Sequence, residues 1–438
     1  MNDLASFLST GVGPLGARVE TFVRDHVLIW SHAPAEPLPP RTRYARAEKK
    51  SVEKELSNIV GRLSSEPART SFLDGTLEPA RTEELASNLR PVFKRLLRLI
   101  DLPLEAVYDA RFLESTRRFI QAARDFDPGL SIASAYQALR NVWIMNSLQF
   151  DLGLPVEHTD AVFAYSMVYP YLDNVLDEAE TSETEKLALV AKLKAWLEGA
   201  ERSADTPREE KLCDLVKLIE RRYARPDFPG VYRSLLAIYN AQVKSLLQQR
   251  VAGSPSPEDI LAISLEKGGT SVLADAYLVA GRLEPADEAF CFGFGTFLQL
   301  ADDLQDIAED ARCGHRTLFS RQAGRAPLDG RAVKLDRYLT AVLERARLGA
   351  TPSRSALCDA IGSGLSLMFL ESVGKHPDYF SRSFVRRSKQ AFPVRFSYLR
   401  KLRRRFGEQL PPGCSRLSDL DPGLVALMAL SSRAFALD

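Results

Sequence analysis

One stretch decides the fold of this chain: FGFGTFLQLADDLQDIAED, residues 292–310. An aromatic, apolar run leads directly into a D-D-x-x-D pattern. Asp302, Asp306 and Asp310 recur at intervals of four, so a helix carries them one turn apart on the same face. Like charges at that spacing repel each other, and we expect a cation to offset them. The stretch therefore predicts an apolar helix that ends in a cation-binding carboxylate cluster.

A second stretch, FAYSMVYPYLDNVLDE at residues 163–178, has the same design. A nearly apolar helix ends with two aspartates four positions apart. The C-terminal end of a helix is the negative end of its dipole and disfavours acids, so two such helices indicate a purpose beyond stability. Mg²⁺ prefers oxygen ligands and is commonly shared between carboxylates and phosphates. We therefore expect several Mg²⁺ ions, held by Asp173, Asp177, Asp302, Asp303 and Asp306; a solvated helix end with incidental acids is the alternative.

The rest of the chain also has a helical pattern. Its 438 residues are 45% hydrophobic and 26% charged, which is sufficient for a large core. Helical segments with short Pro, Gly, Asp or Ser breaks follow one another from about residue 45, with no alternating strand pattern. We predict an all-α fold, a large helical bundle with a central apolar cavity. A proline-rich break at 33–41 contributes to a predicted division into an N-terminal helical extension, 1–100, and the bundle, 101–438.

Four of the expected helices matter for the candidate site, at 131–152, 160–177, 257–281 and 286–311. In the third, Lys267 is followed by a glycine pair, Gly268 and Gly269. We expect this pair to break or kink the helix and to expose backbone N–H groups beside the lysine, as in other anion sites. A plain turn between two helices is the alternative.

Further donors to a diphosphate come from three other places. Arg316, in the loop Gly314-His315-Arg316-Thr317, is suited to a bidentate clamp, whereas His315 is expected to be a bystander. On the helix 131–152, Arg140 could reach the diphosphate, and Asn146 and Gln149 could line the pocket. The predicted substrate-binding residues are Lys267, Arg316, Arg140, Gln299 and Thr270.

Charge and cysteine usage limit the partners and the compartment. Lys plus Arg number 58 against 57 for Asp plus Glu, so overall charge identifies no partner and we expect no nucleic acid. Five scattered cysteines without metal-ligand spacing predict reduced thiols in the cytoplasm. We find no secretory signal and no uninterrupted apolar run of about 18 residues. Assembly as a homodimer is left open.

A basic tract occupies residues 386–405, with nine Lys or Arg and no acidic residue. Such a run is most often a solvated helix face. Two other interpretations remain, which are peripheral contact with a membrane and closure over the diphosphate.

At these residues the chain resembles the class I isoprenoid (terpene) synthase superfamily, and it looks most like bacterial large-terpene synthases and squalene/phytoene synthase-like enzymes. FLQLADDLQD at 297–306 is similar to the second aspartate-rich motif of trans-prenyl diphosphate synthases. Lys267-Gly-Gly-Thr270 is similar to the Lys-Thr region one helix earlier, and YLDNVLD at 171–177 to the first motif of large-terpene synthases. The resemblance covers about residues 130–320 by motif.

The resemblance implies a function and a set of residue roles. Asp173 and Asp177 would bind Mg²⁺ on one wall and Asp302, Asp303 and Asp306 on the other, while Lys267 and Arg316 hold the diphosphate of a prenyl diphosphate substrate. The expected activity is that of a terpene synthase, in which an allylic prenyl diphosphate is ionised and the carbocation cyclises or rearranges.

The chain also departs from the motifs of the superfamily. Chain-elongating enzymes carry Arg-Arg-Gly after the first motif, whereas EAETSETE at 178–185 is acidic, which disfavours addition of isopentenyl diphosphate. The first motif is D-x-x-x-D, and the second lacks the N-x-x-x-S-x-x-x-E pattern of typical cyclases. Two alternatives therefore remain, namely a trans-prenyltransferase (chain-elongating or head-to-head) and a non-catalytic helical binding protein.

Overall fold

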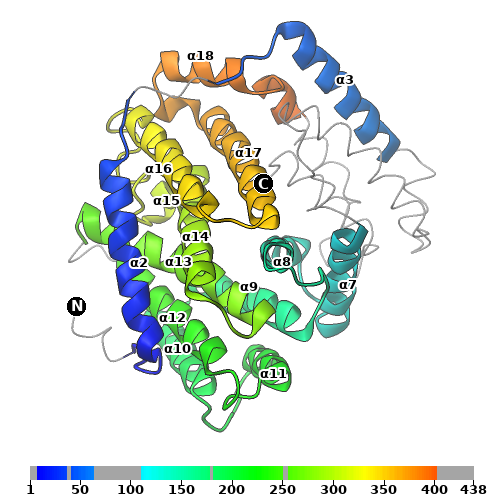
Figure 1. Ribbon diagram of the computed structural model, residues 1–438, viewed down its shortest axis with the longest axis vertical. Helices are drawn as coiled ribbons and strands as arrows, with labels where there is room; N and C mark the ends of the chain where they lie inside the picture. Colours follow the sequence, from blue (N-terminus) through cyan, green and yellow to red (C-terminus); the bar gives the residue numbers. More distant parts are fainter. Residues whose placement is uncertain (1–6, 37–40, 64–109, 178–180, 250–254, 402–438) are drawn as a thin grey trace.

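The described part of the chain is a bundle of α-helices (Figure 1). The computed structural model describes residues 7–36, 41–63, 110–177, 181–249 and 255–401. Within these ranges the regular structure consists of α-helices and short 3₁₀ segments, and no β-strand occurs. The prediction of an all-α fold is therefore confirmed, and the central apolar cavity stays a prediction.

Helices α13 (Pro257–Ala280) and α14 (Pro285–Gln305) pack along each other at the centre of the bundle. Glycines permit this close approach. A Cβ atom at Gly268 would lie 2.4 Å from the carbonyl oxygen of Gly295, and a Cβ at Gly269 would lie 2.4 Å from the ring of Phe292. The prediction that the glycine pair breaks the helix is wrong, because α13 continues through it and the two glycines serve helix packing instead.

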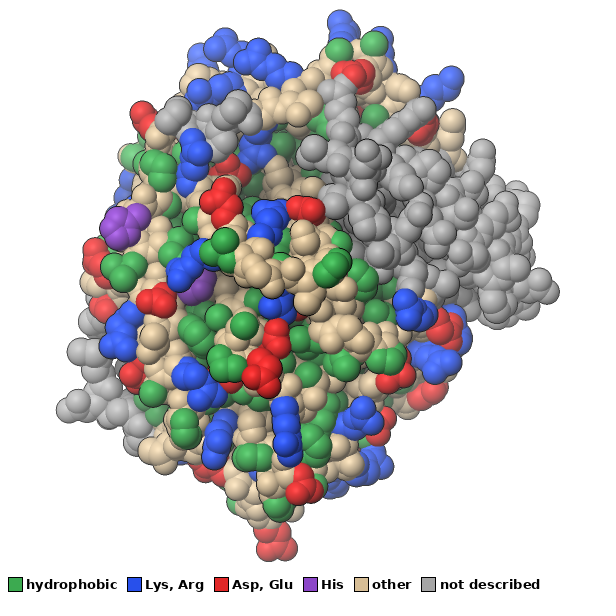
Figure 2. Space-filling view, viewed as in Figure 1, with side chains coloured by type: hydrophobic (Ala, Val, Ile, Leu, Met, Phe, Trp, Pro, Cys, Tyr) green, Lys and Arg blue, Asp and Glu red, His purple; other side chains and the backbone are tan. Residues whose placement is uncertain are grey.

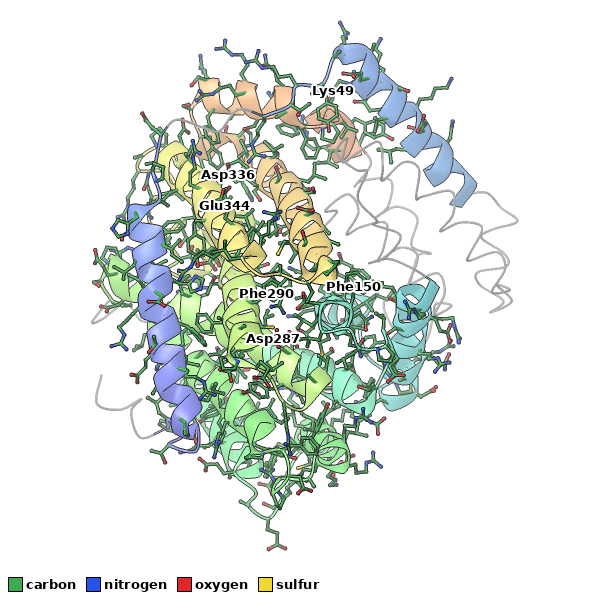
Figure 3. The ribbon with its side chains drawn as sticks, viewed as in Figure 1. Lys49, Phe150, Asp287, Phe290, Asp336 and Glu344 are labelled. Carbon is green, nitrogen blue, oxygen red and sulfur yellow. The ribbon has the colours of Figure 1, made fainter. Side chains whose placement is uncertain are left out.

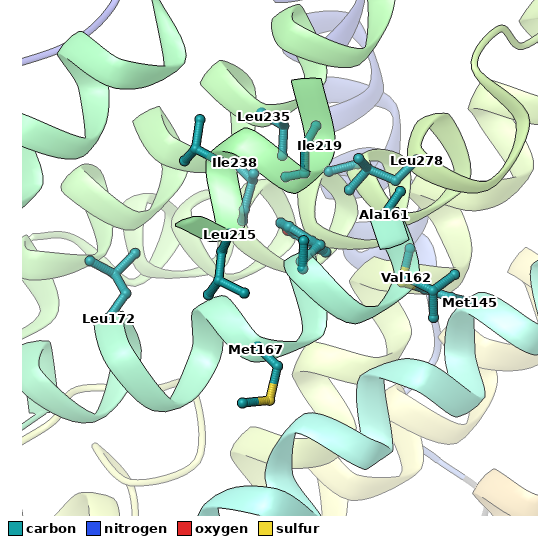
Figure 4. Packing of buried hydrophobic residues seen from close by; sticks show 14 of the residues in the cluster. Met145, Ala161, Val162, Met167, Leu172, Leu215, Ile219, Leu235, Ile238 and Leu278 are labelled. Atoms are coloured by element: carbon teal, nitrogen blue, oxygen red, sulfur yellow. The ribbon is translucent and has the colours of Figure 1, made fainter. Parts of the chain in front are cut away.

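The earlier helices share one hydrophobic core (Figure 4). Leu235, Leu278, Met145 and Met167 all belong to this core. The helices are α7 (Ala110–Phe126), α8 (Ile132–Asp151), α9 (Asp160–Asp177), α10 (Glu183–Leu197), α11 (Pro207–Arg222) and α12 (Pro229–Ser245), followed by the 3₁₀ segment Leu246–Gln249. Helix α9 has the bounds that the sequence predicts.

The later helices build a second core on the other side of α13 and α14. They are α15 (Ile307–Cys313), α16 (Asp329–Arg347), α17 (Pro352–Lys375), the 3₁₀ segment Pro377–Tyr379 and α18 (Arg382–Ala391), with α3 (Arg46–Leu63) packed outside them. Arg354 of α17 donates to Asp151 of α8 at 2.6 Å and to Asp287 of α14 at 2.7 Å, and it lies over the ring of Phe290. Figure 3 labels Asp287 and Phe290 on α14. The contacts of Arg354 join three helices around one largely enclosed cation, whose side chain is 12% exposed.

Helix α17 is the one helix among the described residues that is long and apolar enough to cross a membrane. Its most apolar window is 44% buried within the bundle. It packs against α14, α16, α18 and α8, as a core helix does.

Helix α2 (Gly13–His32) is part of the bundle, although the sequence assigned it to an N-terminal extension. Leu15 and Val19 are buried in the first core, and Trp30 is buried in the second. Arg18 forms a bidentate pair with the buried Glu288 of α14, at 2.7 and 2.9 Å. The division predicted at residue 100 itself lies outside the described residues, but α2 does not belong to a separate extension.

The helix expected at 286–311 is interrupted at Asp306. Helix α14 ends at Gln305, Asp306 has φ −99° and ψ 16°, and α15 begins at Ile307. The 5→1 hydrogen bonds nevertheless continue across the break, because Asp306 N–H donates to Asp302 O at 2.9 Å and Asp310 N–H donates to Asp306 O at 2.9 Å. The carboxylate cluster therefore follows a helical path that bends at its middle residue.

Candidate functional site

Asp303 is held inside the protein at the end of α14. Its side chain is 5% exposed, and both oxygens accept hydrogen bonds, one from Ser264 Oγ of α13 at 3.0 Å and one from Gln299 Nε2 at 2.9 Å. Gln248 continues this chain of contacts by donating to Ser264 Oγ at 3.3 Å. Asp303 thus fastens the end of α14 to α13.

Asp302 and Asp306 have open side chains on consecutive turns. Asp302 exposes 41% of its side-chain surface and accepts from Arg140 Nη2 of α8 at 3.0 Å. Asp306 exposes 47%, and one of its oxygens lies 3.9 Å from Lys375 Nζ, at the end of α17. Each of the two carboxylates therefore has a cation beside it and oxygen surface that a further cation can reach.

The crowding of acids perturbs their proton affinity. Burial raises the pKa of Asp303 to about 7, and the amide of Gln299 opposes that rise. Burial and the neighbouring Asp302 carboxylate raise the pKa of Asp306 to about 7, against the effect of Lys375. Because nearly half of the Asp306 side chain is exposed, solvent screens part of its shift. A divalent cation would favour the ionised form of both groups.

The loop after α15 lies beside the cluster. His315 Nδ1 is 3.3 Å from Asp310 Oδ1, so His315, expected to be a bystander, is the neighbour of the third stacked aspartate. The backbone N–H of Arg316 donates to Gln248 O at 3.1 Å, which fixes the loop to the end of α12 and its 3₁₀ extension. Among the described residues the Arg316 guanidinium has no recorded ion pair.

Sequence reasoning missed Lys375 and His376. His376 Nε2 lies 2.9 Å from Gln305 O, at the C-terminal end of α14. Burial lowers the pKa of His376. The end of α17 thus supplies two nitrogen groups to the cluster from about 70 residues further along the chain, a contact that no local sequence pattern could indicate.

The helix that carries the first aspartate motif is anchored close to it. Tyr171 of α9 donates to Asp127 Oδ2 at 2.6 Å, and Lys211 of α11 forms an ion pair with the same carboxylate. The backbone of α9 is described as far as Asp177. The side chains of Asp173 and Asp177 lie outside the described residues, and their roles stay predictions.

A polar node joins α8, α9 and α13 within the first core. Asn141 Nδ2 donates to Asp275 Oδ1 at 3.0 Å and lies 3.2 Å from Ser166 Oγ. Asp275 is fully buried, its other oxygen has no partner among the described residues, and burial raises its pKa well above the ordinary value. Burial thus favours the protonated form of Asp275, while the hydrogen bond from Asn141 opposes that effect.

Other predicted residues take structural positions. Thr270 is fully buried, and its hydroxyl donates to Glu266 O at 2.6 Å inside α13, which removes it from the carboxylate cluster. Asn146 accepts from Ser115 Oγ, and Gln149 bonds to the backbone of Glu157. Thr270 and Gln149 thus bond within the protein, whereas Asn146 Nδ2 is buried and has no partner among the described residues. Lys267 is half-buried on α13 and has no ion pair among the described residues.

The donor set at the end of α14 fits Mg²⁺ that arrives with a phosphate. Among the described residues, no three His, Cys, Asp or Glu side chains converge closely enough to hold a metal ion alone. Proteins commonly bind Mg²⁺ through one or two carboxylates together with substrate phosphates and water. Asp302 and Asp306 offer two such carboxylates on consecutive turns.

The full set of contacts gives the site its chemical character: hard oxygen ligands, two flanking cations and apolar helices beneath. Such a combination can bind a metal-phosphate group at one end and a hydrocarbon at the other. No family model matches the chain, and no curated protein matches it.

Proposed function

We propose that this protein is a Mg²⁺-dependent enzyme that ionises an allylic prenyl diphosphate, with the activity of a class I terpene synthase. One observation carries the proposal. Asp302 and Asp306 expose carboxylates on consecutive turns at the end of an apolar helix, with Arg140 and Lys375 beside them. Two neighbouring carboxylates repel each other, and a bound Mg²⁺ would offset that repulsion. Arg140 and Lys375 would in turn donate charge-assisted hydrogen bonds to the oxygens of the diphosphate.

The residues divide into ligands and positioning groups. Asp302 and Asp306 hold Mg²⁺, and Asp303 positions both by fixing the last turn of α14 to Ser264. Mg²⁺, when bound, neutralises the diphosphate and makes it a better leaving group. Arg140 and Lys375 then donate to phosphate oxygens while the allylic C–O bond breaks, its electron pair leaving with the diphosphate.

The register of α9 supports a role for the first motif. Positions 173 and 177 fall within about 20° of Ser166 around the helix axis, at 100° per residue. Ser166 bonds to Asn141 inside the bundle, on the side that faces α8 and α13. The backbone register thus puts positions 173 and 177 on the side of α9 that faces α8 and α13. We propose that Asp173 and Asp177 provide the opposite wall of the Mg²⁺ site.

The segment after the first motif favours a cyclase over a chain-elongating enzyme. Ser182 and Glu185 form a capping box that begins α10, with Ser182 N–H donating to the Glu185 carboxylate at 3.0 Å. This acidic stretch starts a helix and offers no cations for a second diphosphate. Product formation should therefore not require isopentenyl diphosphate.

The decisive experiment uses a panel of C10 to C35 allylic diphosphates with Mg²⁺, with and without isopentenyl diphosphate. We expect release of diphosphate and a terpene product, detected by mass spectrometry, without the second substrate. Asp302→Asn and Asp306→Asn should each lose at least about 100-fold in rate, because each removes a charge that acts on the leaving group. Glu309→Gln is the matched control, since Glu309 is an exposed acid of α15 whose recorded partners are Arg312 and Cys313.

The outcome separates the three candidate functions. Products that appear only with isopentenyl diphosphate would assign a chain-elongating prenyltransferase, and a product made from two identical diphosphates would assign a head-to-head enzyme. Absence of any product across the panel, together with binding unaffected by Asp302→Asn and Asp306→Asn, would leave a non-catalytic binding protein.

A further inference from the structure

Helix α18 presents a basic face to solvent. Its buried side chains are Phe384, Val385, Ser388 and Ala391, which pack on the second core. The opposite face exposes Arg382, Arg386, Arg387 and Lys389. No acidic residue occurs from Arg382 to Lys401 in the sequence. Among the described residues, none of these four cations has a recorded ion pair.

Helix α3 carries a second basic stripe. Arg46, Lys50 and Lys54 are exposed and recur at intervals of four, so they lie along one side of the helix. They too have no recorded ion pair within the described part of the chain. The acids of this helix are Glu48, Glu53 and Glu55, against Arg46, Lys49, Lys50, Lys54 and Arg62, so the helix has a net positive charge.

Backbone contacts bring the two helices together. Lys49 Nζ donates to the carbonyl of Lys389, and the backbone N–H of Tyr44 donates to Gln390 O at 3.0 Å (Figure 3). The start of α3 therefore caps the last carbonyls of α18, where a cation is favourable. Arg395 forms an ion pair with Glu53, which adds a second contact between the segments. Figure 2 shows Lys and Arg side chains along this end of the molecule, with fewer acidic ones.

We propose that the basic surface formed by α18 (Arg382, Arg386, Arg387, Lys389) and α3 (Arg46, Lys50, Lys54) docks on an anionic membrane. These seven exposed cations, which have no ion pair within the described ranges, concentrate positive charge at one end of a chain whose overall charge is +1. A positively charged surface of this kind is attracted to a plane of anionic lipid headgroups and gains no such attraction from a neutral membrane.

A lipid surface fits this charge better than a nucleic acid does. The exposed cations belong to two separate helices at one end of the bundle (Figure 1), rather than to one helix that could enter a groove. A membrane needs no such complementary shape, because its headgroups form a continuous plane. The proposal rests on surface charge alone and stands whether or not the proposed chemistry is correct.

The docking surface is joined to the carboxylate cluster by a short segment. Lys375 and His376 contact Asp306 and Gln305, and α18 begins six residues later at Arg382. Docking would therefore hold the end of α14 near the headgroup plane, where a hydrocarbon substrate or product can leave or enter the bilayer.

The test is flotation of the full chain with vesicles of neutral lipid, with or without phosphatidylserine, at low and high salt. We expect binding only to the anionic vesicles and only at low salt. The triple variant Arg382→Gln, Arg386→Gln, Arg387→Gln should bind about 100-fold more weakly, at roughly fivefold per cation. The matched control is Arg208→Gln, Lys217→Gln, Arg221→Gln on α11, at the opposite end of the molecule (Figure 1).

Thermal unfolding shows first that both triple variants are folded. A control variant that binds like the unmodified chain, beside a weakened α18 variant, supports docking through this surface. Equal weakening of both variants, or no flotation at low salt, overturns it. Binding to duplex DNA at a salt concentration where anionic vesicles do not bind would also overturn it and assign the surface to nucleic acid.

Discussion

Three aspartates of one short motif have three different surroundings. Asp303 is buried with both oxygens bonded, Asp302 is open beside Arg140, and Asp306 is open beside Lys375 at the bend between two helices. The sequence predicts the acids and their helical spacing, since that depends on local periodicity. It could not tell which are open, because that depends on Ser264, Arg140 and Lys375, which come from other helices.

Replacing Arg140 with glutamine should weaken binding of Mg²⁺ and pyrophosphate about 10- to 100-fold while hardly changing stability. The Arg140–Asp302 pair is about 40% exposed on both sides, and an ion pair of that kind contributes about 0–1 kcal/mol. Its removal matters for a phosphate ligand because a charge-assisted hydrogen bond is lost. Calorimetric titration measures the affinity, and urea unfolding measures the stability.

The matched control for this prediction is Arg118→Gln, since Arg118 forms a comparable exposed pair with Glu114 on α7. Equal affinities of the Arg140 variant and the unmodified protein would show that Arg140 does not contact the phosphate.

Asp275 makes a prediction about pH. Burial raises its pKa well above the ordinary value, so the folded protein keeps this proton to higher pH than the unfolded chain does. Asp275 therefore lowers the free energy of unfolding increasingly as pH rises above about 4, the pKa of an aspartate in the unfolded chain. The decrease is at most about 1.4 kcal/mol per pH unit. The Asp275→Asn variant has no proton to lose, and it still accepts from Asn141. Its unfolding free energy should fall less between pH 5 and pH 8.

Urea unfolding at both pH values tests this, with Asp214→Asn as the control because Asp214 is exposed on α11. If the variant and the unmodified protein show parallel pH dependence, Asp275 is ionised in the fold.

At the scale of the element, sequence periodicity identified most described helices from α7 onward but misjudged two local features. It gave the bounds of α9 because an apolar run with clear ends determines them. It expected a break at Gly268, where α13 is continuous, and no break at Asp306, where α14 ends. Glycine is ambiguous, since it also permits two helices to touch, and only the packing partner resolves the ambiguity.

Substituting Gly268 with alanine should destabilise the protein by about 1–3 kcal/mol. The added Cβ would lie 2.4 Å from a backbone oxygen of α14, and a backbone atom cannot move aside as a side chain can. The control is Gly364→Ala in α17, where a Cβ has nothing within 4 Å and alanine should stabilise the helix by about 0.5–1 kcal/mol. Chemical denaturation of the two variants should give opposite signs, and equal signs would contradict close α13–α14 packing.

Helix α2 should be sensitive to acid. Burial, followed by the charge of Arg345, lowers the pKa of His26 to about 4, and its ring Nδ1 lies 2.6 Å from Tyr338 Oη of α16. The unfolded chain takes up this proton near pH 6.5 and the folded one only near pH 4. The stability that His26 contributes is present above pH 6.5 and is lost as pH falls toward 4, by about 1–3 kcal/mol.

Unfolding of His26→Gln should accordingly depend less on pH between 7 and 5 than that of the unmodified protein. His32→Gln serves as the control, because His32 is exposed at the end of the same helix. If the variant loses stability as steeply as the unmodified chain when pH falls, the pKa of His26 is not lowered by folding.

At the scale of the whole molecule, α2 is what sequence reasoning failed to place. Its buried side chains are Leu15, Val19, His26 and Trp30, so a polar imidazole ring lies among apolar groups. Leu28, on the other side of the helix, is 55% exposed. This mixture hides the helical stripe, and a proline-rich break after it resembles a linker. The helix nevertheless contributes to both cores, so its position depends on contacts with α12, α13, α14 and α16 that no local pattern records.

Removal of residues 1–32 should therefore abolish cooperative folding. Burial of Leu15, Val19 and Trp30 contributes about 1.5–3 kcal/mol each, and loss of Arg18 would leave Glu288 buried without its ion-pair partner. Together these losses are comparable with the whole stability of a typical protein, about 5–15 kcal/mol. Circular dichroism and urea unfolding of residues 33–438 measure the result. If residues 1–32 were a dispensable extension, the unfolding midpoint of 33–438 would equal that of the full chain. In the full chain we expect Leu15→Ala to lower the free energy of unfolding by about 2–4 kcal/mol more than Leu28→Ala does. Equal effects of the two variants would contradict the burial of α2 in the core.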